Sequence, residues 1–168
     1  MTGRQSARSL LLPALAASCM ATSALAACPV ELATYRDRDD VASVEFRPTG
    51  EGAAVTNTFR MLLENGVVLD GIVMWSEEIG RPYGMLHYQC PEGDSTGAEI
   101  AACTMWEGVI YTAGEAADIG LLPAERSNAP RKLLFPDLGP TLRYSKAYLE
   151  NELSRVPWDV FELSGCQE

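Results

Sequence analysis

Histidine is almost missing from this sequence, because His87 is the only one among 168 residues. A Ser-His-Asp or Cys-His hydrolase would therefore have to use His87 as its base. His87 stands three positions before Cys90, in a stretch whose composition is typical of a strand. That spacing directs the two side chains to opposite faces of the strand. We therefore expect a structural role for His87 and no pairing with a nucleophilic cysteine.

The motifs of most cofactor and metal sites are missing as well. The chain has no Cys-x-x-Cys, no haem-attachment motif, no histidine pair for zinc and no Gly-x-Ser-x-Gly elbow. Phosphate-binding and dinucleotide-binding glycine motifs are also missing. We therefore expect no catalytic residue that motifs alone can identify, no metal site and no cofactor.

One soft-metal alternative remains open at this point. Met85 and His87 share a strand face, and thioether and imidazole together suit copper. Two ligands are too few unless Met61, Met74 or Met105 also contributes. Since methionine most often fills gaps in a core, we favour a packing role for these residues.

Basic side chains are few, with 13 Lys and Arg against 23 Asp and Glu and a formal net charge of −10. This balance disfavours nucleic acid and anionic membrane surfaces as partners. It is typical of a soluble acidic protein. After the N-terminal region, the sequence has no apolar run long enough to span a bilayer.

The first 27 residues have the three-part pattern of a secretory signal peptide. Arg4 and Arg8 precede an apolar run over 10–17, and small residues lead to Ala26 and Ala27. We expect residues 1–27 to be removed, which leaves 28–168 as a single exported domain. Loss of the two arginines would take the net charge from −10 to −12. The expected location is the periplasm or the extracellular space.

The same site permits a second interpretation. Leu25-Ala26-Ala27-Cys28 resembles a bacterial lipobox, in which the cysteine becomes the lipidated first residue of an envelope lipoprotein. Cys28 would then anchor the chain to a membrane, and lipidation is the one route by which we expect a membrane partner. Soluble export is favoured by the cysteine count of the exported chain, which is even only when Cys28 stays free to pair.

Four cysteines remain after the signal peptide is removed, and an exported chain with an even number usually forms disulfides. They permit three pairings. We favour Cys90–Cys103, which closes a short loop, and Cys28–Cys166, which ties the two ends of the domain together. Domain termini often lie close together in space, so the second pairing is geometrically reasonable.

Periodicity predicts an α+β domain with a mainly antiparallel sheet of about seven strands, one short helix and one longer C-terminal helix. Asn65-Gly66 is a strong hairpin signal, and Asp70-Gly71 suggests a bulge. Thr96-Gly97-Ala98-Glu99 matches the capping box of a short helix. The strands are expected at 30–35, 42–46, 54–64, 67–76, 85–90, 109–112 and 158–163, the helices at 97–104 and 141–154, and a surface excursion at 113–132.

The region around Cys90 holds the candidate binding residues. Carboxylates inside the proposed disulfide loop could attract calcium or take part in glycoside hydrolysis, but their spacing fits no EF-hand and chance pairs are common in an acidic chain. Nearby aromatic residues could form a recognition face for protein or glycan, or could fill the core. The candidate binding loop comprises Glu92, Asp94 and Thr96, together with Trp106 and His87, and the aromatic set comprises Tyr83, Tyr88, Trp106, Tyr111 and Trp75.

These observations favour an exported, disulfide-stapled protein of the bacterial envelope that binds an unidentified protein or glycan without catalysis. The alternatives are a small envelope hydrolase that uses acidic residues and the lipoprotein anchored at Cys28. We expect a binding module more than an enzyme, because the common sets of nucleophile, base and metal ligands are missing from the sequence.

Overall fold

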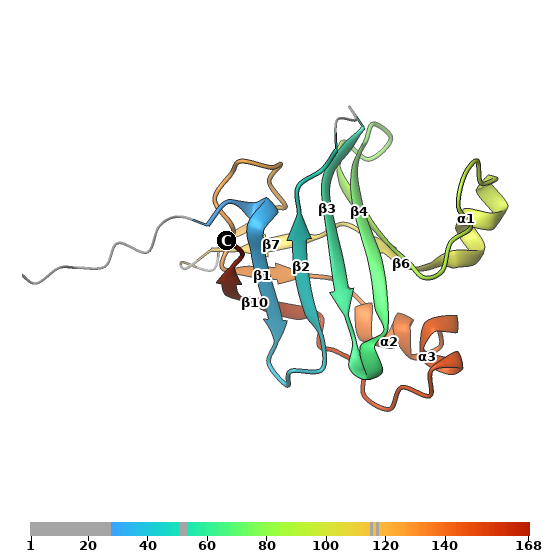
Figure 1. Cartoon of the computed structure of the whole chain (residues 1–168). Helices are drawn as coiled ribbons and strands as arrows, with labels where there is room; N and C mark the ends of the chain where they lie inside the picture. The colour runs from blue at the N-terminus through green and yellow to red at the C-terminus, as the bar shows by residue number, and fades with distance from the viewer. Residues whose placement is uncertain (1–27, 51–53, 115, 117) are drawn as a thin grey trace, which may run out of the picture.

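A computed structural model describes residues 28–50, 54–114, 116 and 118–168. The proposed signal peptide at 1–27 lies outside these residues. One antiparallel sheet of ten strands dominates the fold (Figure 1). The strands are β1 Ala33–Asp37, β2 Ser43–Arg47, β3 Val55–Leu62, β4 Val68–Ser76, β5 Arg81–His87, β6 Thr104–Gly108, β7 Tyr111–Ala113, β8 Ile119–Leu121, β9 Lys132–Leu134 and β10 Val160–Cys166.

The helices are few and short. A 3-10 turn precedes β1 and another joins β3 to β4, while the α-helices lie in the β5–β6 connection and between β9 and β10. In the described part of the chain, no helix is both long enough and apolar enough to cross a bilayer. The bounds are η1 Val30–Leu32, η2 Glu64–Gly66, α1 Gly97–Cys103, α2 Leu138–Arg143 and α3 Lys146–Glu150.

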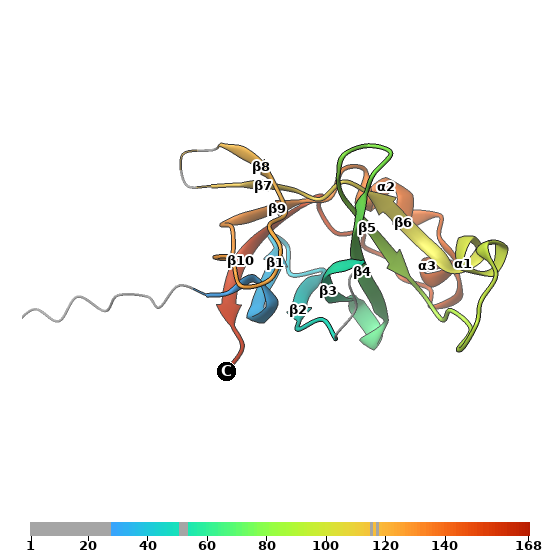
Figure 2. The ribbon, with the colours of Figure 1, turned by 90° about the horizontal axis from the view of Figure 1, so that it is seen from above.

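The sheet is curled into a half-barrel, as the view from above shows (Figure 2). Its strand order is β6-β5-β4-β3-β2-β1-β10-β9-β7-β8, so most neighbours in space are also neighbours in sequence. The exceptions are the pairing of β7 with β9 and the pairing of β1 with β10, and the second of these brings the two ends of the described chain together. Val109 and Ile110 connect β6, at one end of the strand order, to β7, which pairs with β9 and β8 near the other end.

Two features of the predicted architecture need correction. The sheet has ten strands instead of seven, because β6, β8 and β9 were not expected. Strands β8 and β9 have only three residues each and lie in or beside the expected surface excursion, and β6 follows directly on α1, where the helix was expected to continue. The longer helix expected at 141–154 is two short helices. Ser145 divides them, since its side chain accepts a hydrogen bond from the Tyr148 amide and begins α3. The low helix content and the antiparallel sheet are as expected.

The β3–β4 hairpin confirms one turn signal and contradicts another. Asn65 and Gly66 have φ angles of 57° and 73°, the left-handed conformation that this dipeptide tolerates. The bulge expected at Asp70-Gly71 is wrong, because Gly71 pairs in register with Phe59. The register shift instead lies between Val55 and Asn57 on the partner strand.

The concave side of the sheet is filled by aromatic side chains. Phe135 contacts Phe59, Trp106 and Phe161 with ring centroids 5.3–5.9 Å apart and rings steeply inclined. Phe59 in turn contacts Phe46, which packs edge-on against Tyr35. Such edge-to-face pairs add about 0.5–1.5 kcal/mol each beyond burial of their apolar area. The interior is therefore packed with side chains.

The segment between β9 and β10 covers one end of the half-barrel. Leu138 and Leu142 of α2 and Tyr148 of α3 belong to the same core cluster as the sheet residues. Asp159 holds α2 in place, because its carboxylate accepts hydrogen bonds from the amides of Asp137 (2.9 Å) and Gly139 (3.1 Å). This anchors the N-terminal turn of α2 to the chain that enters β10.

Two disulfides cross-link the domain. Cys28 is bonded to Cys166 with Cα atoms 5.8 Å apart, and Cys90 to Cys103 with Cα atoms 5.2 Å apart. This is the pairing that we favoured from the sequence. The first bond reinforces the contact of β1 with β10, where Ala33 is the register partner of Cys166.

Candidate functional site

The chain from β5 to β6 forms a disulfide-closed clip, defined here as residues 88–103. The Tyr88 amide donates a hydrogen bond to the Cys103 carbonyl (2.9 Å), and the Cys90–Cys103 bond closes the loop. Helix α1 occupies the second half of the clip and lies beyond the end of the sheet, away from β1 and β10 (Figure 1). The clip is therefore a small projecting unit that two adjacent strands hold at its base.

Within the clip, Thr96 and Glu99 form the predicted capping box. The Thr96 hydroxyl accepts from the Glu99 amide (3.3 Å), and the Glu99 carboxylate accepts from the Thr96 amide (2.8 Å). A third contact joins the Thr96 hydroxyl to the same carboxylate (2.8 Å). These hydrogen bonds favour the charged form and lower the pKa of Glu99. Glu92 and Asp94 are exposed in the preceding loop.

His87 lies at the end of β5 with its side chain on the convex side of the sheet. Its cross-strand neighbours are Asp70 on β4 and Thr104 on β6. Burial lowers the pKa of His87, and the nearby negative charge of Asp70 opposes this effect. The Nε2 atom is buried without a hydrogen-bond partner among the described residues. The burial of the ring and the missing partner of Nε2 therefore both favour the neutral form of His87.

Trp106 is not part of an exposed binding loop, which corrects that expectation. It lies on β6, is 3% exposed, and packs against Phe135. Its indole N–H donates to the Pro136 carbonyl (2.9 Å), which satisfies the one polar atom of the buried ring. Residues 103–106 lead from the clip into the core. The sequence pattern alone does not show that Cys103 belongs to the clip and Trp106 to the core.

The aromatic residues near the clip do not form one recognition face. Tyr88 and Trp106 are buried, whereas Trp75 is 49% exposed at the far end of β4. Tyr83 and Tyr111 are half-buried on the convex side. Burial raises the pKa of Tyr83, and the negative charge of Glu107 adds to this effect. The structure therefore separates residues that the sequence had placed together.

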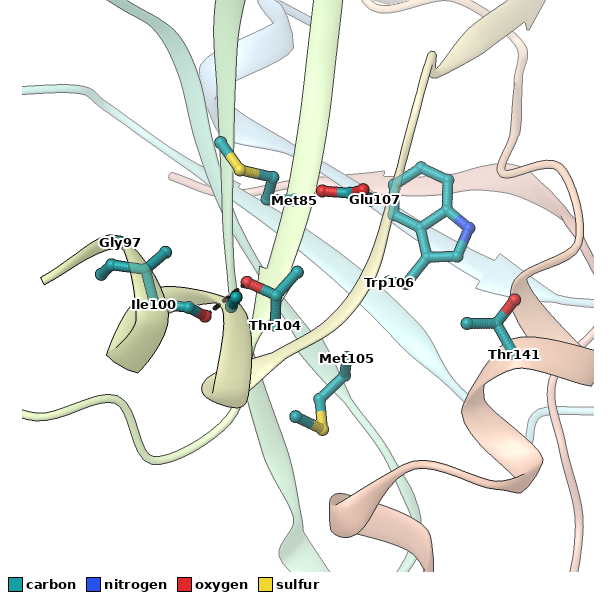
Figure 3. Close-up of a pocket in the computed structure, with 9 residues that line it drawn as sticks. Met85, Gly97, Ile100, Thr104, Met105, Trp106, Glu107 and Thr141 are labelled. Carbon is teal, nitrogen blue, oxygen red and sulfur yellow. Dashed lines mark hydrogen bonds between the residues drawn. The ribbon is translucent and has the colours of Figure 1, made fainter.

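A groove of about 420 Å³ lies between the clip and the rest of the domain (Figure 3). Helix α1 forms one wall with Ile100 and Ala101, and Thr141 of α2 contributes from the opposite side. Strand β6 and Met85 of β5 form the floor. The full lining is Met85, Gly97, Ile100, Ala101, Thr104, Met105, Trp106, Glu107 and Thr141.

Ionisable side chains are few in the groove. Among the described lining residues, Glu107 has the one ionisable side chain, and it is exposed. The Thr104 hydroxyl donates to the Ile100 carbonyl (2.8 Å), a contact that ties β6 to the last turn of α1 (Figure 3). The groove therefore offers polar and apolar contact in nearly equal measure, with one negative charge at its side.

Sequence reasoning placed the site near the clip but missed most of its residues. Met85 was noted for a different reason, and Glu107 and Thr141 carried no motif. Thr141 is 34 positions after Glu107 in the sequence, so only the packing of α2 beside β6 brings them to one groove. Of the predicted loop residues, Trp106 alone lines it, whereas Glu92, Asp94, Thr96 and His87 lie nearby in the clip or at its base.

A second groove of about 470 Å³ lies on the α2–α3 segment. Two apolar side chains beside it are strongly exposed, Tyr144 at 81% and Leu149 at 68%. In the part of the chain described, no three His, Cys, Asp or Glu side chains are grouped closely enough to hold a metal ion.

Comparison of the chain with protein-family models, with curated proteins and with solved structures found no match.

Proposed function

We propose that this protein is an exported binding module, and that it binds its partner in the groove between the clip and α2. The observation that carries this proposal is the construction of the groove. Its α1 wall is fixed by a disulfide, a capping box and the Thr104–Ile100 hydrogen bond. A rigid wall reduces the conformational entropy that is lost when a partner binds.

The lining supports binding more directly than chemistry. Met85, Ile100 and Met105 offer apolar contact, and methionine adapts to differently shaped partners. The single carboxylate, Glu107, has no second carboxylate beside it in the lining, whereas glycoside hydrolysis commonly uses a pair. A binding role therefore needs no group beyond those present.

The two disulfides support the proposed export, because such bonds persist in oxidising compartments. The lipoprotein alternative is mutually exclusive with the Cys28–Cys166 bond, since one sulfur atom cannot carry both. Intact mass of the purified protein from a secreting host therefore separates the two. Two disulfides and no acyl mass are expected, and an acyl group on Cys28 would contradict the soluble form.

Two neighbouring alanines of α1 provide a matched test of the groove. Both are exposed, but Ala101 lines the groove and Ala102 does not. Ala101→Arg should fill the groove, while Ala102→Arg adds the same side chain and charge beside it. We expect immobilised wild type and Ala102→Arg to retain the same partner from envelope extract, and Ala101→Arg to lose it. Equal retention by both variants, or no retained partner at all, would contradict the proposal.

A further inference from the structure

We propose that the partner is an extended peptide segment rich in lysine or arginine, bound along the open edge of β6 as an added strand. This inference rests on the proposed function, because it assigns a chemistry to the partner of the same groove. Three observations carry it: an unpaired strand edge, a groove that follows that edge, and an uncompensated negative charge around it.

Strand β6 stands at one end of the sheet and pairs with β5 alone. Successive residues of an antiparallel strand direct their N–H and C=O groups alternately toward its two edges. Among the described residues, no strand pairs with the second edge of β6. An edge of this kind is a template for pairing with another extended chain.

The groove follows this edge. Thr104 and Glu107 lie on the convex side of β6, toward Met85, whereas Met105 and Trp106 are directed into the protein (Figure 3). The register shift at Leu86–His87, opposite Met105, explains why two successive residues share the inner side. Because residues of both sides line one groove, that groove runs along the strand edge. This is the geometry used when a peptide adds a strand to a sheet.

The walls suit alternating side chains of such a peptide. An added strand directs every second side chain to the same side. On the convex side it would meet Met85, Ile100 and the carboxylate of Glu107. Apolar residues of the peptide can contact the first two, and a lysine or arginine can reach the third.

The charge around the groove favours a basic peptide. Between Arg81 and Arg126 the sequence contains no lysine or arginine and seven Asp or Glu residues. Among the described residues, none of the carboxylates in and beside the clip forms an ion pair; these are Glu92, Asp94, Glu99 and Glu107. A concentration of one charge sign steers an oppositely charged partner and stabilises its complex.

The test uses the purified chain with both disulfides formed and three labelled eight-residue peptides. The first alternates lysine and valine, the second alternates glutamate and valine, and the third is the lysine peptide with alternate backbone nitrogens methylated. Fluorescence anisotropy measures the Kd of each at low and at high salt. We expect the lysine peptide to bind with a Kd that increases as the salt concentration rises. At low salt, its affinity should exceed that of each of the other two peptides by about tenfold or more.

A carboxylate pair provides the control on the protein. Glu107→Gln removes the charge of the groove at an exposed position. It should raise the Kd of the lysine peptide by about twofold to fivefold, which is the range of an exposed ion pair. Glu78→Gln removes a charge that is also exposed, in the β4–β5 turn, and should leave the Kd unchanged. Circular dichroism of both variants checks that they remain folded. If either variant is unfolded, the Kd values of the three peptides on the wild-type protein test the inference alone.

The outcomes separate this inference from the proposed function. Equal binding of the methylated peptide would overturn strand addition, and equal binding of the glutamate peptide would overturn the charge assignment. If no peptide binds but partner capture still depends on Ala101, the inference fails and the groove remains a binding site. If capture also fails, both are wrong.

Discussion

Gly71 of β4 lies directly beneath the ring of its cross-strand partner Phe59, so closely that a Cβ atom at position 71 would overlap the ring carbons. Gly71→Ala should therefore force the ring of Phe59 out of its contacts with Phe46 and Phe135. Overpacking of this kind costs about 1–3 kcal/mol in the free energy of unfolding. Chemical denaturation of the variant measures this cost.

Gly97→Ala is the control, because a Cβ at Gly97 meets no heavy atom within 4 Å and alanine favours the helix that begins there. Unchanged stability of Gly71→Ala would mean that Phe59 does not pack over this strand.

The two disulfides should differ in their contribution to stability. In the chain-entropy model, a bond that closes 138 residues (Cys28–Cys166) contributes about 5 kcal/mol, and one that closes 13 residues (Cys90–Cys103) about 3 kcal/mol. Paired Cys→Ser variants compared by urea unfolding should therefore rank in that order. The reverse order would show that the clip contributes to the stability of the sheet and does more than hold α1.

His87 should give the protein a stability change in mildly acidic solution. Burial lowers its pKa in the folded state below the ordinary value of 6.5. The unfolded chain therefore binds the proton more readily, so the contribution is complete above about pH 6.5 and is lost as the pH falls toward the folded-state pKa. Urea unfolding of His87→Gln between about pH 5 and 7 should show a flatter profile than wild type. Because the chain has one histidine, an identical slope in both proteins would assign the effect to carboxylates.

Asp37 should be the most sensitive carboxylate of the β1–β2 turn. It is 3% exposed and accepts hydrogen bonds from the amides of Val41 (2.7 Å) and Ala42 (3.0 Å). Asp37→Asn should cost about 1–3 kcal/mol in the free energy of unfolding, since hydrogen bonds to a buried charge are stronger than neutral ones. Asp40→Asn, which breaks an exposed ion pair with Arg36, should cost less than about 1 kcal/mol. Thermal or chemical denaturation compares the two, and equal losses would contradict the role of Asp37.

Local signals in the sequence predicted local features well. The capping box at Thr96 and Glu99, the turn at Asn65-Gly66 and most of β2, β3, β4 and β10 depend on neighbours within a few residues. The strand β5 begins earlier than expected, because Arg81 and Pro82 resemble a loop but pair with Ser76 and Trp75. Proline is tolerated there because β6 pairs with β5 only from Gly84 onward, so Pro82 lies where β5 has a strand neighbour on one side alone.

Features that depend on distant contacts could not be predicted. No residue near Ala33 indicates that β1 pairs with β10. The residues around Trp106 likewise do not show whether its side chain lies in the core or in a binding site. The groove has the same difficulty, because Thr141 reaches it only through the packing of α2 beside β6. Asp159 is a further example of a contact between residues far apart in the sequence. It caps α2 from 20 positions away in sequence, where no capping motif can be read.

The pairing of the first strand with the last has a consequence for how the molecule is made. A ribosome releases β1 well before β10, and Cys28 precedes its partner Cys166 by 138 residues. During synthesis, one edge of β1 therefore stays without its partner while the strands from β2 to β9 emerge. Unpaired edges in partly made sheets favour aggregation. Cys28 and Cys166 can form their disulfide only after β10 has emerged, so this bond does not protect the edge of β1 before then.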